Sequence, residues 1–112
     1  MGRIGSIWHT HHYLCDPHTA TGWDVACQYR EKTADQRPMV VLSTASPYKF
    51  GCAVVEALGG NLADPNEFDR MYRIYKMTNV PIPENLAGLR QMPVRHDTVI
   101  AKEEMTDFVL SL

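Results

Sequence analysis

The densest group of hydroxyl and amine side chains lies in the segment Ser43–Phe50, which reads Ser-Thr-Ala-Ser-Pro-Tyr-Lys-Phe. Its Ser46-Pro47 pair is typical of a helix N-cap followed by proline in the first turn. Because amide groups at a helix N-terminus attract anions, the hydroxyls of Ser43, Thr44 and Ser46 together with Lys49 could hold a phosphate or a cofactor. The residue types alone favour a structural explanation, in which Ser46 caps the helix, Thr44 ends a strand and Lys49 is solvated.

Histidines and cysteines are the other candidates for chemistry. They are His9, His11, His12, His18, Cys15, Cys27 and Cys52. Helical spacing permits His9 and His12 to share a face, but no HExxH motif or cysteine partner completes a metal set, so we expect no metal site. An odd number of widely spaced cysteines indicates neither a disulfide framework nor a CxxC pair, so we expect reduced thiols. The spacing does not show whether any cysteine lies beside a histidine base.

The composition is that of one soluble domain. The 112 residues are 45% hydrophobic and 21% charged, a composition that excludes a disordered chain. The formal net charge is −2, and the sequence lacks the basic patch of a nucleic-acid binder. The longest uninterrupted apolar run is Met39–Leu42, far short of the roughly 20 residues that cross a bilayer. Residues 1–15 show no signal-peptide pattern. We therefore expect a cytoplasmic protein with no membrane or nucleic-acid partner.

Helical periodicity and capping signals predict most of the chain as helices. The expected helices span Gly2 to Tyr13, Asp16 to Glu31, Ser46 to Leu58, Asp64 to Asn79, one turn around Leu86–Leu89, and a terminal helix over Met105–Leu112. Asp16-Pro17 and Asp64-Pro65 each read as an N-cap followed by proline at the first helical position.

The apolar run Met39–Leu42 predicts a strand over Met39–Ser43, because consecutive apolar residues suit a strand buried on both faces. Thr98–Ile100 predicts a second, short strand. A strand that is buried on both faces, like the one predicted over Met39–Ser43, needs parallel neighbouring strands and helices that cover both faces of the sheet. The rest of this chain does not supply the neighbouring strands. We therefore predict an α/β fold class, as a helix-rich piece of a larger domain with one or two strands flanked by helices. The alternative is a small helical domain in which Met39–Leu42 is a buried segment.

Several segments together resemble the C-terminal part of threonine synthase in order and spacing. They read C-D-P-H-T-A over residues 15–20, V-V-L-S-T-A-S-P-Y-K-F over 40–50, V-P-I-P-E-N-L-A-G-L over 80–89, and R-H-D over 95–97. The resemblance covers nearly the whole chain, and Ser43–Phe50 is its most specific part. One departure is Thr21, where the family pattern usually has valine. The resemblance implies that residues 1–112 are the C-terminal part of a large domain of the tryptophan-synthase-like fold (fold type II), without a complete catalytic domain.

Threonine synthase uses pyridoxal 5'-phosphate to convert O-phosphohomoserine and water to threonine and phosphate. The resemblance implies that Thr44 is a cofactor-binding residue, with its hydroxyl against the pyridine nitrogen. A neutral hydroxyl would leave that nitrogen mostly unprotonated. The family's Schiff-base lysine and Gly-rich phosphate loop belong to an upstream segment without a counterpart here, and Lys49 is not that lysine. We therefore expect no catalytic residue in this chain and no activity from it alone.

Two functions follow as expectations. In the first, the chain works with the upstream half of the same enzyme. In the second, it is a non-catalytic interaction module that self-associates through an open strand edge. The presence or absence of a separately encoded upstream half distinguishes them.

Overall fold

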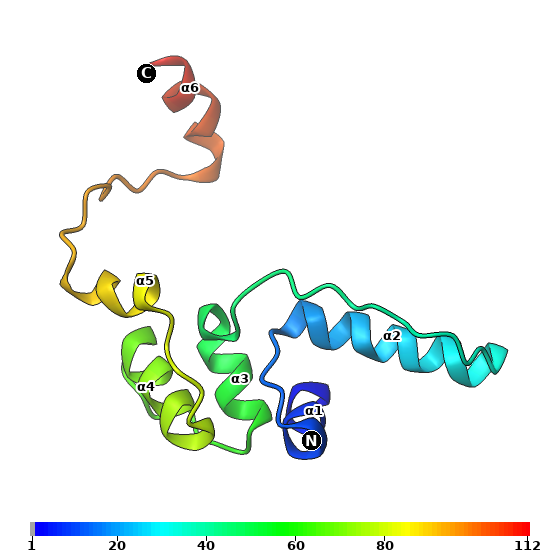
Figure 1. The fold of residues 1–112 in the computed structure, drawn as a ribbon. Coiled ribbons are helices and arrows are strands. Elements are labelled where there is room, and N and C mark those ends of the chain that lie inside the picture. Colours follow the sequence, from blue (N-terminus) through cyan, green and yellow to red (C-terminus); the bar gives the residue numbers. More distant parts are fainter. Residues whose placement is uncertain (1) are drawn as a thin grey trace.

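The computed structural model describes residues 2–112 as helices joined by extended segments (Figure 1). The elements are α1 (Arg3–His11), α2 (Pro17–Thr33), η1 (Pro47–Phe50), α3 (Gly51–Ala57), α4 (Glu67–Thr78), α5 (Glu84–Ala87), η2 (Gly88–Gln91), η3 (Lys102–Glu104) and α6 (Met105–Leu110). Helix α3 packs on α4 and α1, and α1 packs on α2. These four helices form the body of the molecule.

Helix α2 begins where the sequence predicts. Asp16 is its N-cap in extended conformation, and its carboxylate accepts hydrogen bonds from the backbone N–H groups of His18 and Thr19. Pro17 occupies the first helical position. Proline fits there because an N–H group at this position would make no hydrogen bond within the helix. The helix ends at Thr33, and its C-cap Ala34 adopts a left-handed conformation with φ of 55°. The predicted start of this helix is confirmed, and its end lies two residues beyond the predicted one.

Helices α3 and α4 approach each other closely at Gly51. A Cβ atom at this position would lie 2.9 Å from Oε2 of Glu67 and 3.0 Å from Cβ of Arg70. The predicted N-cap of α4 is wrong: Asn66, not Asp64, accepts the hydrogen bond from the N–H of Asp69. The carboxylate of Asp64 instead pairs with the guanidinium of Arg73.

The core lies where α1, α3 and α4 meet the segment before α2. Its buried apolar residues are Ile4, Ile7, Leu14, Cys15, Ala20, Tyr48, Val54, Val55, Leu58, Met71 and Ile74. Residues of α5 and α6 are not part of this buried set.

The predicted α/β fold class is wrong, because residues 2–112 contain no strand. Met39–Ser43 is extended but has no neighbouring strand to bond with, and it runs along α2 instead (Figure 1). Met39 and Val41 line a small hollow against α2, whereas Val40 is 87% exposed. The alternative prediction, a helical domain in which Met39–Leu42 is buried, is also wrong on this point, because Val40 is exposed. Thr98–Ile100 is likewise not a strand.

The C-terminal segment stands apart from the helical body. Residues 92–101 form an extended connection that leads to η3 and α6, drawn in orange and red in Figure 1. The radius of gyration is 18.3 Å, whereas a compact domain of this length has a value of about 13 Å. The predicted terminal helix is confirmed from Met105 to Leu110, two residues short of its predicted end, and its apolar side chains are exposed.

Candidate functional site

Thr44 lies in an exposed segment directly before η1. Its side chain and that of Ser43 are exposed, and neither has a hydrogen-bond partner within residues 2–112. Ser46 is the N-cap of η1, and its Oγ accepts a hydrogen bond of 3.3 Å from the N–H of Tyr48. The structural explanation therefore holds for Ser46 and for the solvated Lys49, but it is wrong for Thr44, because residues 2–112 contain no strand that Thr44 could end. The hydroxyl of Thr44 remains available to a ligand.

Tyr48 anchors the end of this segment to the body. Its side chain is 3% exposed, and its Oη donates a 2.5 Å hydrogen bond to the carbonyl oxygen of Val80. Burial raises the pKa of the Tyr48 phenol above its ordinary value. The phenol therefore stays a hydrogen-bond donor at neutral pH, and the position of η1 is fixed relative to the end of α4.

A second polar group lies at the start of α2. Asp16 is fully buried, yet it accepts hydrogen bonds from the Thr19 hydroxyl and from the N–H of His18, and Nδ1 of His18 lies 2.9 Å from its Oδ1. Burial by itself raises the pKa of the Asp16 carboxyl, but the hydrogen bonds from Thr19 and His18 outweigh it, so that the net pKa is lowered. Asp16 is therefore a buried carboxylate at neutral pH.

The two polar groups are joined by an aromatic contact. The ring of His18 packs edge-on against the ring of Phe50, with the centroids 5.1 Å apart. The start of α2 and the end of η1 are therefore neighbours in space, although His18 and Phe50 are 32 positions apart in sequence. The sequence indicated Asp16 only as a cap, and its bond with the His18 ring was not predicted, although the D-P-H-T spacing carries the signal.

The other candidate residues do not join this region. His11 packs on Trp23 and His12 packs on Trp8. Within residues 2–112, no three His, Cys, Asp or Glu side chains are grouped so as to hold a metal ion. The three cysteines are free thiols, and burial together with the neighbouring Asp16 charge raises the pKa of Cys15. All four lysines are exposed.

The chain matches the family model described as threonine synthase, C-terminal, over residues 19–109. Threonine synthase from Corynebacterium glutamicum is 37% identical over 83 residues, which are 70% of this chain and 17% of that protein. The protein of the same name from Methylobacillus glycogenes is 37% identical over 97 residues, which are 84% of this chain and 20% of that protein. Threonine synthase from Schizosaccharomyces pombe is 46% identical over 59 residues, 52% of this chain and 12% of that protein.

The family model places this chain in the C-terminal region of an enzyme family. The chain spans a fifth or less of the length of these curated relatives. The family is threonine synthase, and the chain belongs to it. The predicted resemblance is confirmed. In residues 2–112, every helix is too short or too polar to span a lipid bilayer.

Proposed function

We propose that residues 1–112 supply the C-terminal part of the large domain of a threonine synthase that uses pyridoxal 5'-phosphate. The reaction converts O-phosphohomoserine and water to threonine and phosphate. The observation that carries the proposal is the family match over residues 19–109, which includes the exposed Thr44 segment. The cytoplasmic location stays a prediction.

Thr44 suits one edge of the cofactor. When bound, the cofactor supplies an electron sink for the amino-acid substrate. The Thr44 hydroxyl is exposed and has no partner within residues 2–112, so it is free to donate a hydrogen bond to the pyridine nitrogen. Tyr48 and the Ser46 cap hold the backbone that follows Thr44. In this proposal the chain orients the ring and does not react with it.

The remaining part of the site must come from outside this segment. The family resemblance assigns the Schiff-base lysine to an upstream region, and all four lysines of this chain lie at the solvent-exposed surface. The structure also has a groove along α4, with a volume of about 710 Å³ and with Phe68, Tyr72 and Ile82 in its lining. No residue of the Thr44 segment lines this groove. We therefore expect the isolated chain to be inactive and the upstream half of the enzyme to be its partner.

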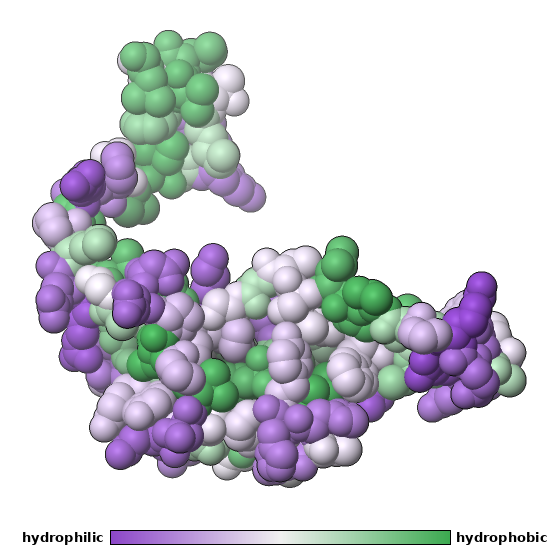
Figure 2. Space-filling model, viewed as in Figure 1, coloured by the Kyte–Doolittle hydropathy of each residue, from purple (hydrophilic) through white to green (hydrophobic). Residues whose placement is uncertain are grey.

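The exposed apolar side chains of the extended segment suit contact with that partner. Val40 is 87% exposed and Leu42 is 76% exposed, immediately before Ser43 and Thr44. Figure 2 shows this apolar surface on the extended segment above α2. Burying such side chains stabilises an assembly by about 1.5–3 kcal/mol each. The alternative of self-association through an open strand edge loses its basis, because residues 2–112 contain no strand.

A chimeric enzyme tests the role of Thr44. In it, this chain replaces the corresponding C-terminal segment of the Corynebacterium glutamicum threonine synthase. Thr44→Val keeps the shape but leaves the pyridine nitrogen unpaired, at a cost of about 1–3 kcal/mol. Cofactor affinity, measured by a fluorescence titration, should fall roughly 5- to 150-fold, and threonine formation should fall with it.

Two variants control this experiment. Thr44→Ser keeps the hydroxyl and should bind the cofactor as the unmodified chimera does. Ser43→Ala removes the neighbouring exposed hydroxyl and should also have no effect. Unchanged cofactor affinity in Thr44→Val, or a loss only in Ser43→Ala, would remove Thr44 from the site.

A further inference from the structure

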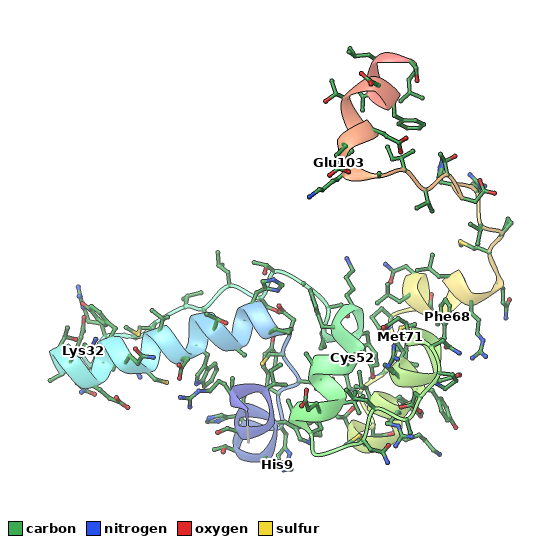
Figure 3. All side chains as sticks on the ribbon, turned by 180° about the vertical axis from the view of Figure 1, so that it is seen from behind. His9, Lys32, Cys52, Phe68, Met71 and Glu103 are labelled. Atoms are coloured by element: carbon green, nitrogen blue, oxygen red, sulfur yellow. The ribbon has the colours of Figure 1, made fainter. Side chains whose placement is uncertain are left out.

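An apolar groove runs along α4 beside α5. Its apolar lining comes from Phe68, Met71, Tyr72, Met77, Ile82 and Ala87. Tyr72 is 55% exposed and Met77 is 38% exposed. Figure 3 labels Phe68 and Met71 on this helix. The groove has a volume of about 710 Å³, which is enough for several large side chains.

The rim of the groove carries an excess of positive charge. The guanidinium of Arg73 pairs with Asp64, and that of Arg90 lies 3.1 Å from Asp69. The ammonium of Lys76 lies 5.6 Å from the centre of the Tyr72 ring and has no carboxylate partner within residues 2–112. Three cations therefore face two carboxylates around an apolar floor, so an occupant with an apolar face and acidic flanks would fit.

The C-terminal segment 102–112 has these properties. Met105, Phe108, Val109 and Leu112 follow the i, i+3, i+4, i+7 spacing of a single helix face. All four side chains are exposed, and Leu112 is 92% exposed. The acidic residues Glu103, Glu104 and Asp107 lie in the same segment with one cation, Lys102, so that its net charge is negative. Glu103 lies 3.4 Å from Lys102, and Glu104 accepts a hydrogen bond from the N–H of Ala101. Figure 3 labels Glu103 on this part of the chain, away from α4.

The connection between groove and segment is long enough for them to meet. Residues 92–101 separate the end of η2 at Gln91 from the start of η3 at Lys102, and an extended connection of ten residues spans up to about 33–36 Å. Helix α4 has 12 residues, so its length is about 18 Å. Because Arg90 lines the groove, the connection starts at the groove itself.

We propose that the segment 102–112 docks into the α4 groove of its own chain as an amphipathic helix. The apolar face of α6 covers Phe68, Tyr72 and Met77, and its acidic residues lie beside Lys76. A connection of this length gives an effective concentration in the millimolar range. At micromolar protein concentration, the segment therefore occupies the groove of its own chain more often than the groove of a second copy.

Small-angle X-ray scattering of the full 112-residue chain tests the proposal, with sedimentation velocity to define the oligomeric state. The docked chain is a monomer whose radius of gyration lies several ångströms below the 18.3 Å of the open form. Phe108→Asp places a charge on the apolar face and should return the value to about 18 Å. Because Phe108 lies outside the buried core, this variant should keep its helices, as circular dichroism would show.

A charge exchange tests the polar contact. Lys76→Glu should open the chain, and the double variant Lys76→Glu with Glu104→Lys should close it again. The proposal is overturned by a radius of gyration near 18 Å in the unmodified chain, by one that Phe108→Asp leaves unchanged, or by a double variant that stays open. A dimer whose population rises with concentration would show that a second copy occupies the groove, which also overturns docking within one chain.

Discussion

A buried carboxylate organises the start of α2. Asp16 is fully buried and receives hydrogen bonds from the backbone and the side chains of the two residues that follow Pro17. Removing it leaves the hydroxyl of Thr19, a residue that is only 4% exposed, without its acceptor, whereas the His18 side chain is exposed to water. Because the same residues connect α2 to the ring of Phe50, the effect should extend beyond the helix cap.

Asp16→Ala should destabilise the chain by about 1–3 kcal/mol, through loss of the N-cap and of the bond from Thr19. Urea unfolding followed by circular dichroism measures this change. Glu31→Ala, at an exposed position of the same helix, serves as a control with an effect of at most about 0.5 kcal/mol. An Asp16→Ala variant as stable as the unmodified chain would show that the Asp16 bonds contribute nothing net.

The lowered pKa of Asp16 predicts how stability depends on pH. A carboxyl whose pKa is lower in the folded state contributes stability that is fully present above the unfolded-state value of about 3.9. That contribution is lost as the pH falls through the folded-state pKa. Unfolding free energies measured between pH 6 and pH 2 should therefore decline more steeply for the unmodified chain than for Asp16→Asn. Parallel curves for the two proteins would contradict this assignment.

Tyr48→Phe isolates the anchor of η1. The substitution removes only the hydroxyl that donates to the carbonyl oxygen of Val80. We expect a loss of about 1–2 kcal/mol in unfolding free energy, because this carbonyl then lacks its partner. Tyr13→Phe, at an exposed position, is the matched control and should be neutral. Equal effects of the two substitutions would mean that the bond to Val80 does not stabilise the fold.

At the scale of elements, the packing of α3 on α4 sets the stability of the body. Val54 and Ile74 are completely buried where these helices meet. Ile74→Ala should cost about 2–5 kcal/mol, because a cavity replaces the lost side chain. Glu56→Ala, on an exposed position of α3, should change the unfolding free energy by at most about 0.5 kcal/mol. A small effect of Ile74→Ala would show that this interface is loosely packed.

The sequence predicts the helices better than the fold class, for reasons that particular residues show. Pro17 after Asp16 fixes the start of α2 through local bonds, which depend on few other residues. Met39–Leu42 is different, because a strand exists only when a neighbouring strand supplies hydrogen bonds, and periodicity does not report whether one is present. Asn66 and not Asp64 caps α4, and the carboxylate of Asp64 pairs instead with Arg73, a contact over nine positions that the local capping pattern does not predict.

The candidate site is predicted only in part for the same reason. The sequence places Thr44 before a capped turn, and the structure has it there, exposed and without a partner in residues 2–112. The contact between His18 and Phe50 depends on how α2 and η1 pack, which their separate patterns do not specify.

At the scale of the whole molecule, two of the segments that expose large apolar side chains bear on how the molecule assembles. One is the extended segment with Val40 and Leu42, and the other is the C-terminal segment with Met105 and Val109. A single domain of this length rarely leaves two such surfaces uncovered. We propose that the first contacts the upstream half of the enzyme and that the second docks into the groove along α4.

Phosphate release from O-phosphohomoserine by the chimeric enzyme tests the central claim most directly. We predict that the chimera containing this chain releases phosphate and forms threonine in equal amounts. Neither this chain alone nor the Corynebacterium glutamicum protein without its corresponding segment should do so. A chimera that folds and binds the cofactor but releases no phosphate, or phosphate release by this chain alone, would contradict the account.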